Sequence, residues 1–151
     1  INSEWTPYQS HMVLMGKDIT VDSLGNTADP NNIASPDNLK FSETLRTLFI
    51  GEDSGNHTNN FLWAYNVDNK TLDRILSTPA GAESTGLHAV DSVNGWTYIM
   101  SNFQHPGDSS KIPADVKTAV LKNYDNGFSA CVGYITADVL PSVEKKAATT
   151  K

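Results

Sequence analysis

Short runs of β-forming residues alternate with polar turn segments through the middle of the chain. Residues 61–67 alternate aromatic with smaller side chains at period 2, which predicts a half-buried strand. Residues 68–70 supply turn chemistry, so residues 72–76 can return as the antiparallel partner of a hairpin. Further strands are predicted at residues 45–51, 96–100 and 130–136, with a weaker one at 87–90. This pattern predicts a mainly β fold.

Two features qualify that prediction. Phe49-Ile50 and Tyr98-Ile99 recur 49 residues apart, each at the end of a predicted strand, and this spacing is in the range of a propeller blade. Residues 114–122 place Val116, Ala119 and Val120 on one face, which predicts one short amphipathic helix.

The composition limits the classes of partner. The chain of 151 residues carries 11 basic and 17 acidic side chains, and its net charge of −6 disfavours binding to nucleic acid. No apolar run approaches the roughly 20 residues that cross a bilayer, so no membrane span is expected. The single cysteine, Cys131, excludes an internal disulfide and a multi-cysteine zinc site, and we expect it to be buried packing.

The chain divides into three parts by composition and predicted secondary structure. Residues 1–34 are loop-rich, residues 35–140 hold the predicted strands and helix, and residues 141–151 form a polar tail. No signal peptide is visible, and Ile1 in place of Met suggests processing, trimming or a fragment.

Polar segments at or near strand ends are the candidate sites, because a sheet can hold functional groups in position there. These segments are residues 35–39, 51–60, 79–86 and 101–107. Their carboxylate and amide oxygens are the ligands that calcium requires. In any single segment, ordinary turn chemistry is the more common explanation of Asp, Asn, Ser and Gly. Glu83 has no special turn role, although solvent exposure alone would account for it.

Several common catalytic motifs are missing from the sequence. It contains no HExxH motif, no Gly-rich phosphate loop and no Gly-x-Ser-x-Gly elbow, so zinc-hydrolase, nucleotide-binding and serine-hydrolase functions by those routes are unsupported. His57 and His105 lie in candidate site segments, whereas His11 and His88 are expected to be ordinary surface or hydrogen-bonded residues.

Five ordered motifs resemble the C-terminal portion of the PhoX-type alkaline phosphatases. They are Ser35-Pro-Asp-Asn-Leu-Lys-Phe41, Leu48-Phe-Ile-Gly-Glu-Asp53, Asn60-Phe-Leu-Trp-Ala-Tyr65, Thr78-Pro-Ala-Gly-Ala-Glu-Ser-Thr-Gly86 and Ile99-Met-Ser-Asn-Phe-Gln-His-Pro-Gly107. The resemblance covers residues 36–107 strongly and extends more loosely to Thr136. It implies a β-propeller phosphomonoesterase with an iron and calcium centre, exported to the periplasm or beyond.

Site residues follow from the same resemblance. Glu52 and Glu83 look like the metal-binding glutamates of the Gly-Glu-Asp and Gly-Ala-Glu motifs, with three residues as companions. Those companions are Asp37, Asn38 and Asp53. His105 looks like a residue on the phosphate side or behind the metal ligands. Apart from the resemblance, the clustering of Asn102, Gln104 and His105 after a predicted strand suggests that they offer donors to phosphate oxygens.

Members of that family are longer than this chain and place a cysteine ligand to iron in their N-terminal part, a position that Cys131 does not match. We therefore expect two or three blades of a partial propeller, completed by the same precursor or by another chain, with phosphate monoesters as substrates. Two alternatives stay open: a calcium-stabilised β module without catalysis, and a calcium-dependent lactonase-like propeller hydrolase.

Overall fold

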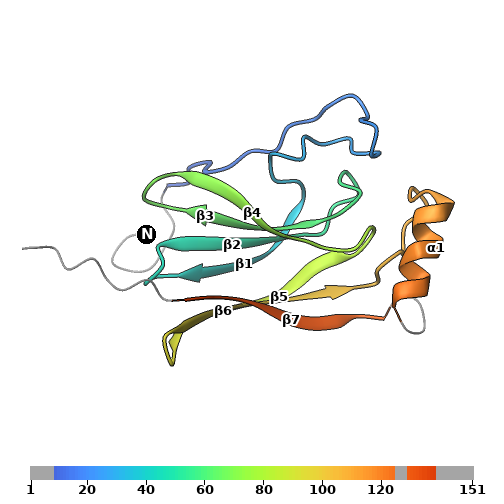
Figure 1. The fold of residues 1–151 in the computed structure, drawn as a ribbon. Coiled ribbons are helices and arrows are strands. Elements are labelled where there is room, and N and C mark those ends of the chain that lie inside the picture. The colour runs from blue at the N-terminus through green and yellow to red at the C-terminus, as the bar shows by residue number, and fades with distance from the viewer. Residues whose placement is uncertain (1–8, 125–128, 139–151) are drawn as a thin grey trace, which may run out of the picture.

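The computed structural model describes residues 9–124 and 129–138 and is mainly β with one short helix, which confirms this coarser part of the fold expected from the sequence. One antiparallel sheet has the order β1 (Pro36–Ser42), β2 (Thr47–Glu52), β3 (Phe61–Asn66) and β4 (Thr71–Ser77). A second has the order β5 (Glu83–Val93), β6 (Trp96–Gln104) and β7 (Cys131–Asp138), and helix α1 (Ala114–Asn123) lies between β6 and β7 in the chain (Figure 1). Neither sheet closes on itself within the described residues.

Strand β1 differs from the prediction, because residues 35–39 were expected to be a polar loop. Their Pro, Asp and Asn disfavour a strand in isolation. The strand occupies the edge of its sheet, where proline is tolerated at the first position, and Leu39 and Phe41 point to solvent at 62% and 42% exposure. Pairing with β2 from Pro36 to Ser42 therefore overrides the local preference.

Strands β5 and β6 are longer than their sequence predicts. Residues 79–86 were expected to be a loop, but β5 begins at Glu83. β6 continues to Gln104, so Asn102 and Gln104 lie on a strand and not in the segment that follows it. Cross-strand pairing explains both extensions, since Glu83 is opposite Gln104 and Thr85 is opposite Asn102.

The two sheets pack against each other through a small apolar core. Phe49 of β2, Leu62 of β3 and Ile99 of β6 form a buried cluster between them. Full burial of side chains of this size stabilises a fold by about 1.5–3 kcal/mol each. At the edge of this contact the Ser42 hydroxyl donates to Asp91 Oδ1 over 2.5 Å, which joins β1 to β5.

The opposite face of the four-stranded sheet packs against the N-terminal segment. Ile50, Trp63 and Tyr65 contribute to a second buried cluster with Ile33, and Leu14 packs against it. Residues 11–15 form no helix or strand, although His11-Met-Val-Leu-Met15 is the most apolar part of the loop-rich segment. Their Met and Val side chains are exposed, and only Leu14 is half-buried.

Helix α1 extends across one end of the second sheet in Figure 1. Its Val120 is buried with Ala80 and Ile112, whereas Val116 and Ala119 remain exposed, so the predicted apolar face is only partly used. Cys131 is a free, half-buried cysteine at the start of β7. The predicted tail at residues 141–151 lies outside the described residues.

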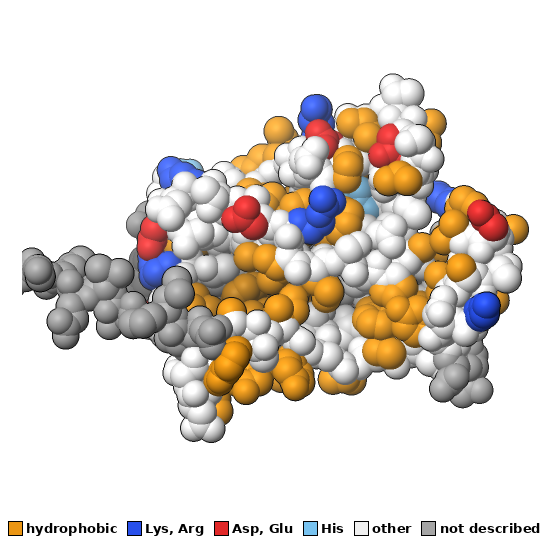
Figure 2. Space-filling view, viewed as in Figure 1, with side chains coloured by type: hydrophobic (Ala, Val, Ile, Leu, Met, Phe, Trp, Pro, Cys, Tyr) orange, Lys and Arg blue, Asp and Glu red, His pale blue; other side chains and the backbone are white. Residues whose placement is uncertain are grey.

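The face drawn in Figure 2 shows acidic and basic side chains scattered among hydrophobic and neutral ones, with no single charged patch. Among the described helices none is long and apolar enough to cross a membrane.

Candidate metal centre

Four strand ends that lie far apart in the sequence meet at one end of the two sheets. β1 begins there opposite the end of β2, with Pro36 paired to Glu52. β5 begins there opposite the end of β6, with Glu83 paired to Gln104. The sequence motifs at these four strand ends therefore come together, as expected for polar groups held by a sheet.

Asp53, Glu83 and His105 form the candidate metal site. One potential ligand atom from each residue lies within 4.8 Å of the other two. Glu83 is buried, His105 is half-buried and Asp53 is exposed, so the cluster opens to solvent on the Asp53 side. The Glu83 Oε2 and His105 Nε2 atoms are 3.5 Å apart.

The backbone fixes the orientation of the His105 ring. Nδ1 lies 3.2 Å from the carbonyl oxygen of Gly81, which can only accept, so Nδ1 carries the proton and donates it. Nε2 is then turned toward Glu83. Histidines that bind metals are commonly held in this way by a carbonyl on the far nitrogen. His105 also has a φ of 42°, a left-handed conformation that non-glycine residues adopt at a cost and that tends to occur at functional sites.

The environment of the cluster disfavours the charged form of Asp53. Partial burial and the neighbouring Glu83 carboxylate raise the pKa of Asp53 above its ordinary value of 3.8. His105 opposes that shift, and Asp37 adds to it. A bound cation would relieve this repulsion.

Asp37 and Asn38 lie beside the cluster at the beginning of β1, where the Asn38 side chain donates to Asp37 Oδ2 over 2.7 Å. Gln104 Nε2 donates a hydrogen bond to Glu83 Oε2, so this side chain holds a candidate ligand in place. Asn102 lies apart from them, with its amide against Gly86 on the β5–β6 ladder. Of the three predicted phosphate-side residues, the structure brings His105 and Gln104 to the cluster.

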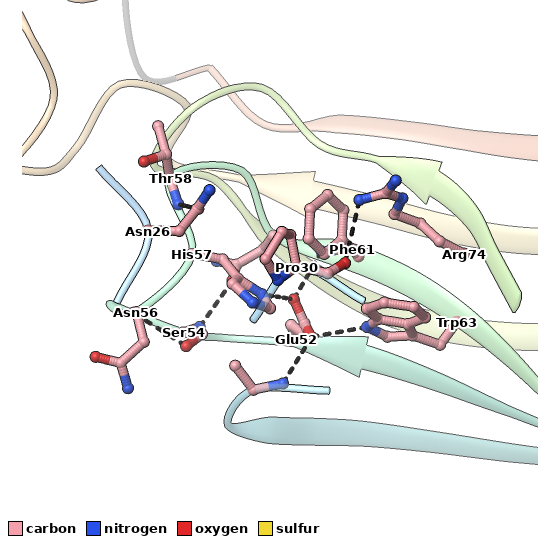
Figure 3. Close-up of polar contacts among 12 residues, drawn as sticks. Asn26, Pro30, Glu52, Ser54, Asn56, His57, Thr58, Phe61, Trp63 and Arg74 are labelled. Carbon is pink, nitrogen blue, oxygen red and sulfur yellow. Dashed lines mark hydrogen bonds and ion pairs between the residues drawn. The ribbon is translucent and has the colours of Figure 1, made fainter. Parts of the chain in front are cut away.

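Glu52 lies in a different environment from the one its motif suggested. Its carboxylate is fully buried and accepts hydrogen bonds from Ala34 N at 2.8 Å, Phe61 N at 3.0 Å and Trp63 Nε1 at 2.7 Å. His57 Nδ1 lies 2.9 Å from its second oxygen (Figure 3). These four contacts occupy both oxygens, so Glu52 joins the N-terminal segment to β3.

Strand geometry explains why two adjacent acids have separate roles. Successive side chains of a strand point to opposite faces. Glu52 lies two residues after Ile50 and shares its face of β2, toward the N-terminal segment, where its carboxylate accepts from Ala34 N. Arg74 lies above the Phe61 ring at the border of that network. Asp53 is one residue beyond Glu52 and faces Glu83 and His105.

A polar pocket of about 140 Å³ adjoins the cluster and includes residues that the sequence did not single out. Asp53 and His105 line it together with Asp108 and Lys111 from the segment that follows β6. The Lys111 ammonium donates to the Gly55 carbonyl over 2.8 Å and so bridges two loops. No motif marks Asp108 or Lys111, because their segment has the composition of an ordinary turn.

The donor set fits a transition metal better than calcium. Imidazole nitrogen with carboxylate oxygens suits iron, zinc or manganese, whereas calcium takes six to eight oxygens. Three protein ligands are also enough for a catalytic metal that keeps an open position. The iron implied by the resemblance is therefore compatible with this cluster. The implied calcium would need further oxygens, and Asp37 and Asn38 are the nearest predicted source.

Comparison with known proteins identifies no relative: no family model matches the chain, and neither curated proteins nor solved structures give a match.

Proposed function

We propose that this chain contributes a metal site to a metal-dependent phosphomonoesterase of the alkaline phosphatase type. The observation that supports this function best is the convergence of Asp53, Glu83 and His105 from three separate sequence motifs beside a polar pocket. In this proposal the three residues hold an iron-type cation. Such an ion neutralises phosphate charge and supplies a nucleophilic oxygen at neutral pH.

The residues of the chain prepare this site before substrate arrives. The Gly81 carbonyl fixes the tautomer and direction of His105, and the Gln104 amide orients Glu83. The pocket beside Asp53 then receives the phosphate group, which a loop network of small polar residues encloses. These contacts keep the ligand atoms in place before the cation binds, which lowers the cost of ordering the site.

The sheet organisation supports a propeller as the larger framework. Sheet β1–β4 has the four antiparallel strands of a propeller blade, and β5–β7 repeats its first three strands in the same order. β2 and β6 carry the two copies of the aromatic-isoleucine pair that are 49 residues apart in the sequence. We propose that the remaining blades come from the same precursor or from another chain, in the periplasm or outside the cell.

The test is hydrolysis of p-nitrophenyl phosphate by the protein that carries this chain, with wild type compared with Glu83→Gln after reconstitution with ferrous iron, calcium or both. We expect wild-type activity that needs the metal and falls at least about 100-fold in the variant. Equal rates in both proteins would refute the proposal. A panel of lactones in the same assay tests the lactonase alternative. Stabilisation by calcium without hydrolysis of either class would favour the structural module.

A further inference from the structure

We infer that Lys111 binds the phosphate group of the substrate, as the cationic side of the pocket next to Asp53, Glu83 and His105. The inference rests on the proposed function and adds to it the residue that recognises the transferred group. It begins from the position of Lys111, which lines the same pocket as two of the three candidate metal ligands.

The Lys111 ammonium is positioned by the fold. It donates to the Gly55 carbonyl over 2.8 Å, and its backbone N–H donates to the Ser109 hydroxyl over 3.2 Å. An ammonium has three donors, so the bond to Gly55 leaves two for a ligand in the pocket. The long side chain is therefore anchored at its charged end, which reduces the entropy lost when it binds an anion.

The charges around the pocket make this lysine important for an anion. Asp53, Glu83 and Asp108 bring three negative charges, and Lys111 is the one lysine or arginine lining the described pocket. Together with the positive charge of Lys111, a divalent cation at the metal site would balance these three negative charges. Binding of phosphate should therefore need both the metal and Lys111, since either one alone leaves the pocket negative.

The size of the pocket favours a small group. Its volume of about 140 Å³ is roughly ten times the ~10–15 Å³ that one water molecule needs, which is enough for a phosphate group. The leaving group of a monoester would extend through the open side. The site would therefore select the phosphate and remain tolerant of the alcohol.

The experiment measures the affinity of the chain for inorganic phosphate by equilibrium dialysis, with micromolar radiolabelled phosphate and with or without manganese. The variants are Lys111→Met, which removes charge and donor, and Lys111→Arg, which keeps both. Lys122→Met on the exposed end of α1 is the matched control. Loss of a charge-assisted hydrogen bond predicts about tenfold to hundredfold weaker phosphate binding in Lys111→Met, with wild-type binding in the control and most of the affinity kept in Lys111→Arg.

The outcomes separate this inference from the proposed function. Manganese affinity and unfolding temperature are measured on each variant, and we expect both to stay near wild type in Lys111→Met. Wild-type phosphate affinity in that variant would overturn the inference while the metal site stands. Failure of the wild type to bind metal would instead overturn the proposed function.

Discussion

Gly51 and Ser84 approach so closely that a Cβ at position 51 would overlap the Ser84 carbonyl oxygen. This contact joins β2, which ends one residue before Asp53, to β5, which begins at Glu83. Because a backbone carbonyl is on the other side, a larger residue at position 51 can be accommodated only by moving a strand. The absence of a side chain at Gly51 therefore sets the spacing of the candidate metal site.

Gly51→Ala should separate β2 from β5 and weaken the metal site. We expect a loss of about 1–3 kcal/mol in the free energy of unfolding, typical of an overpacked core. Metal affinity should also fall, since the ligands of the two strands move apart. Urea unfolding and metal titration measure the two effects, with Gly133→Ala, where an added Cβ makes only an ordinary contact at 3.8 Å from the Ser101 carbonyl oxygen, as the comparison. Unchanged metal affinity in Gly51→Ala would show that this contact does not set the site.

Glu52→Gln should destabilise the fold whether or not metal is present. The amide would direct N–H groups at backbone and indole donors, and the buried partner His57 would lose its carboxylate. Breaking such a buried pair costs about 3–5 kcal/mol. Urea unfolding with and without chelator measures the loss, and Glu43→Gln on the surface serves as control, with a change within about 0.5 kcal/mol. A loss seen only in the presence of metal would instead make Glu52 a ligand.

Asp53→Asn should stabilise the metal-free chain at neutral pH. Burial and Glu83 raise the pKa of Asp53 in the folded state, so the folded chain holds its proton more tightly than the unfolded chain. Stability therefore falls as pH rises from the ordinary value of 3.8 through the folded pKa, and the asparagine variant avoids this loss.

Thermal unfolding in chelator from pH 3 to pH 7.5 checks the Asp53 prediction. The two proteins should agree below about pH 3.8, diverge as pH rises from 3.8 to the folded pKa, and keep a constant difference above it. With saturating metal, wild type should be the more stable protein, because Asp53→Asn lacks one metal ligand. A variant less stable than wild type in chelator at neutral pH would contradict the assignment.

Ser42→Ala should weaken the contact between the sheets in a pH-dependent manner. The Ser42 hydroxyl, followed by Thr44, lowers the pKa of Asp91 below 3.8. A lowered carboxyl pKa gives stability that is present above the unfolded pKa and lost as pH falls through the folded value. We expect the free energy of unfolding of wild type to exceed that of Ser42→Ala by about 1 kcal/mol at pH 7. Urea unfolding at pH 7 and pH 2.5 tests this, and an equal difference at both values would exclude the Asp91 carboxylate as the cause.

The periodic strands could be predicted from sequence because their own side chains specify them. β3 alternates Phe61, Trp63 and Tyr65 on one face, and the turn at residues 67–70 follows directly. β1 could not be predicted in the same way, since its residues disfavour a strand and only pairing with β2 explains it. The packing of the half-buried Leu14 likewise depends on a surface formed by residues much later in the chain.

The candidate site was predictable where motifs fall at strand ends. Asp53, Glu83 and His105 were all expected near a site, and the structure brings them together. Glu52 shows the limit of this reasoning: a motif does not reveal that one carboxylate faces the core and its neighbour faces the pocket. Lys111 carried no sequence signal, because its significance arises from a bridge to Gly55, 56 residues earlier in the chain.

The most direct measurement is the metal content of the chain after anaerobic dialysis against ferrous iron, for wild type, Glu83→Gln and the surface control Glu43→Gln. The account predicts stoichiometric iron in wild type and control, and its loss in Glu83→Gln at an unchanged fold by circular dichroism. Wild-type iron content in Glu83→Gln, or no iron in any of the three proteins, would contradict it.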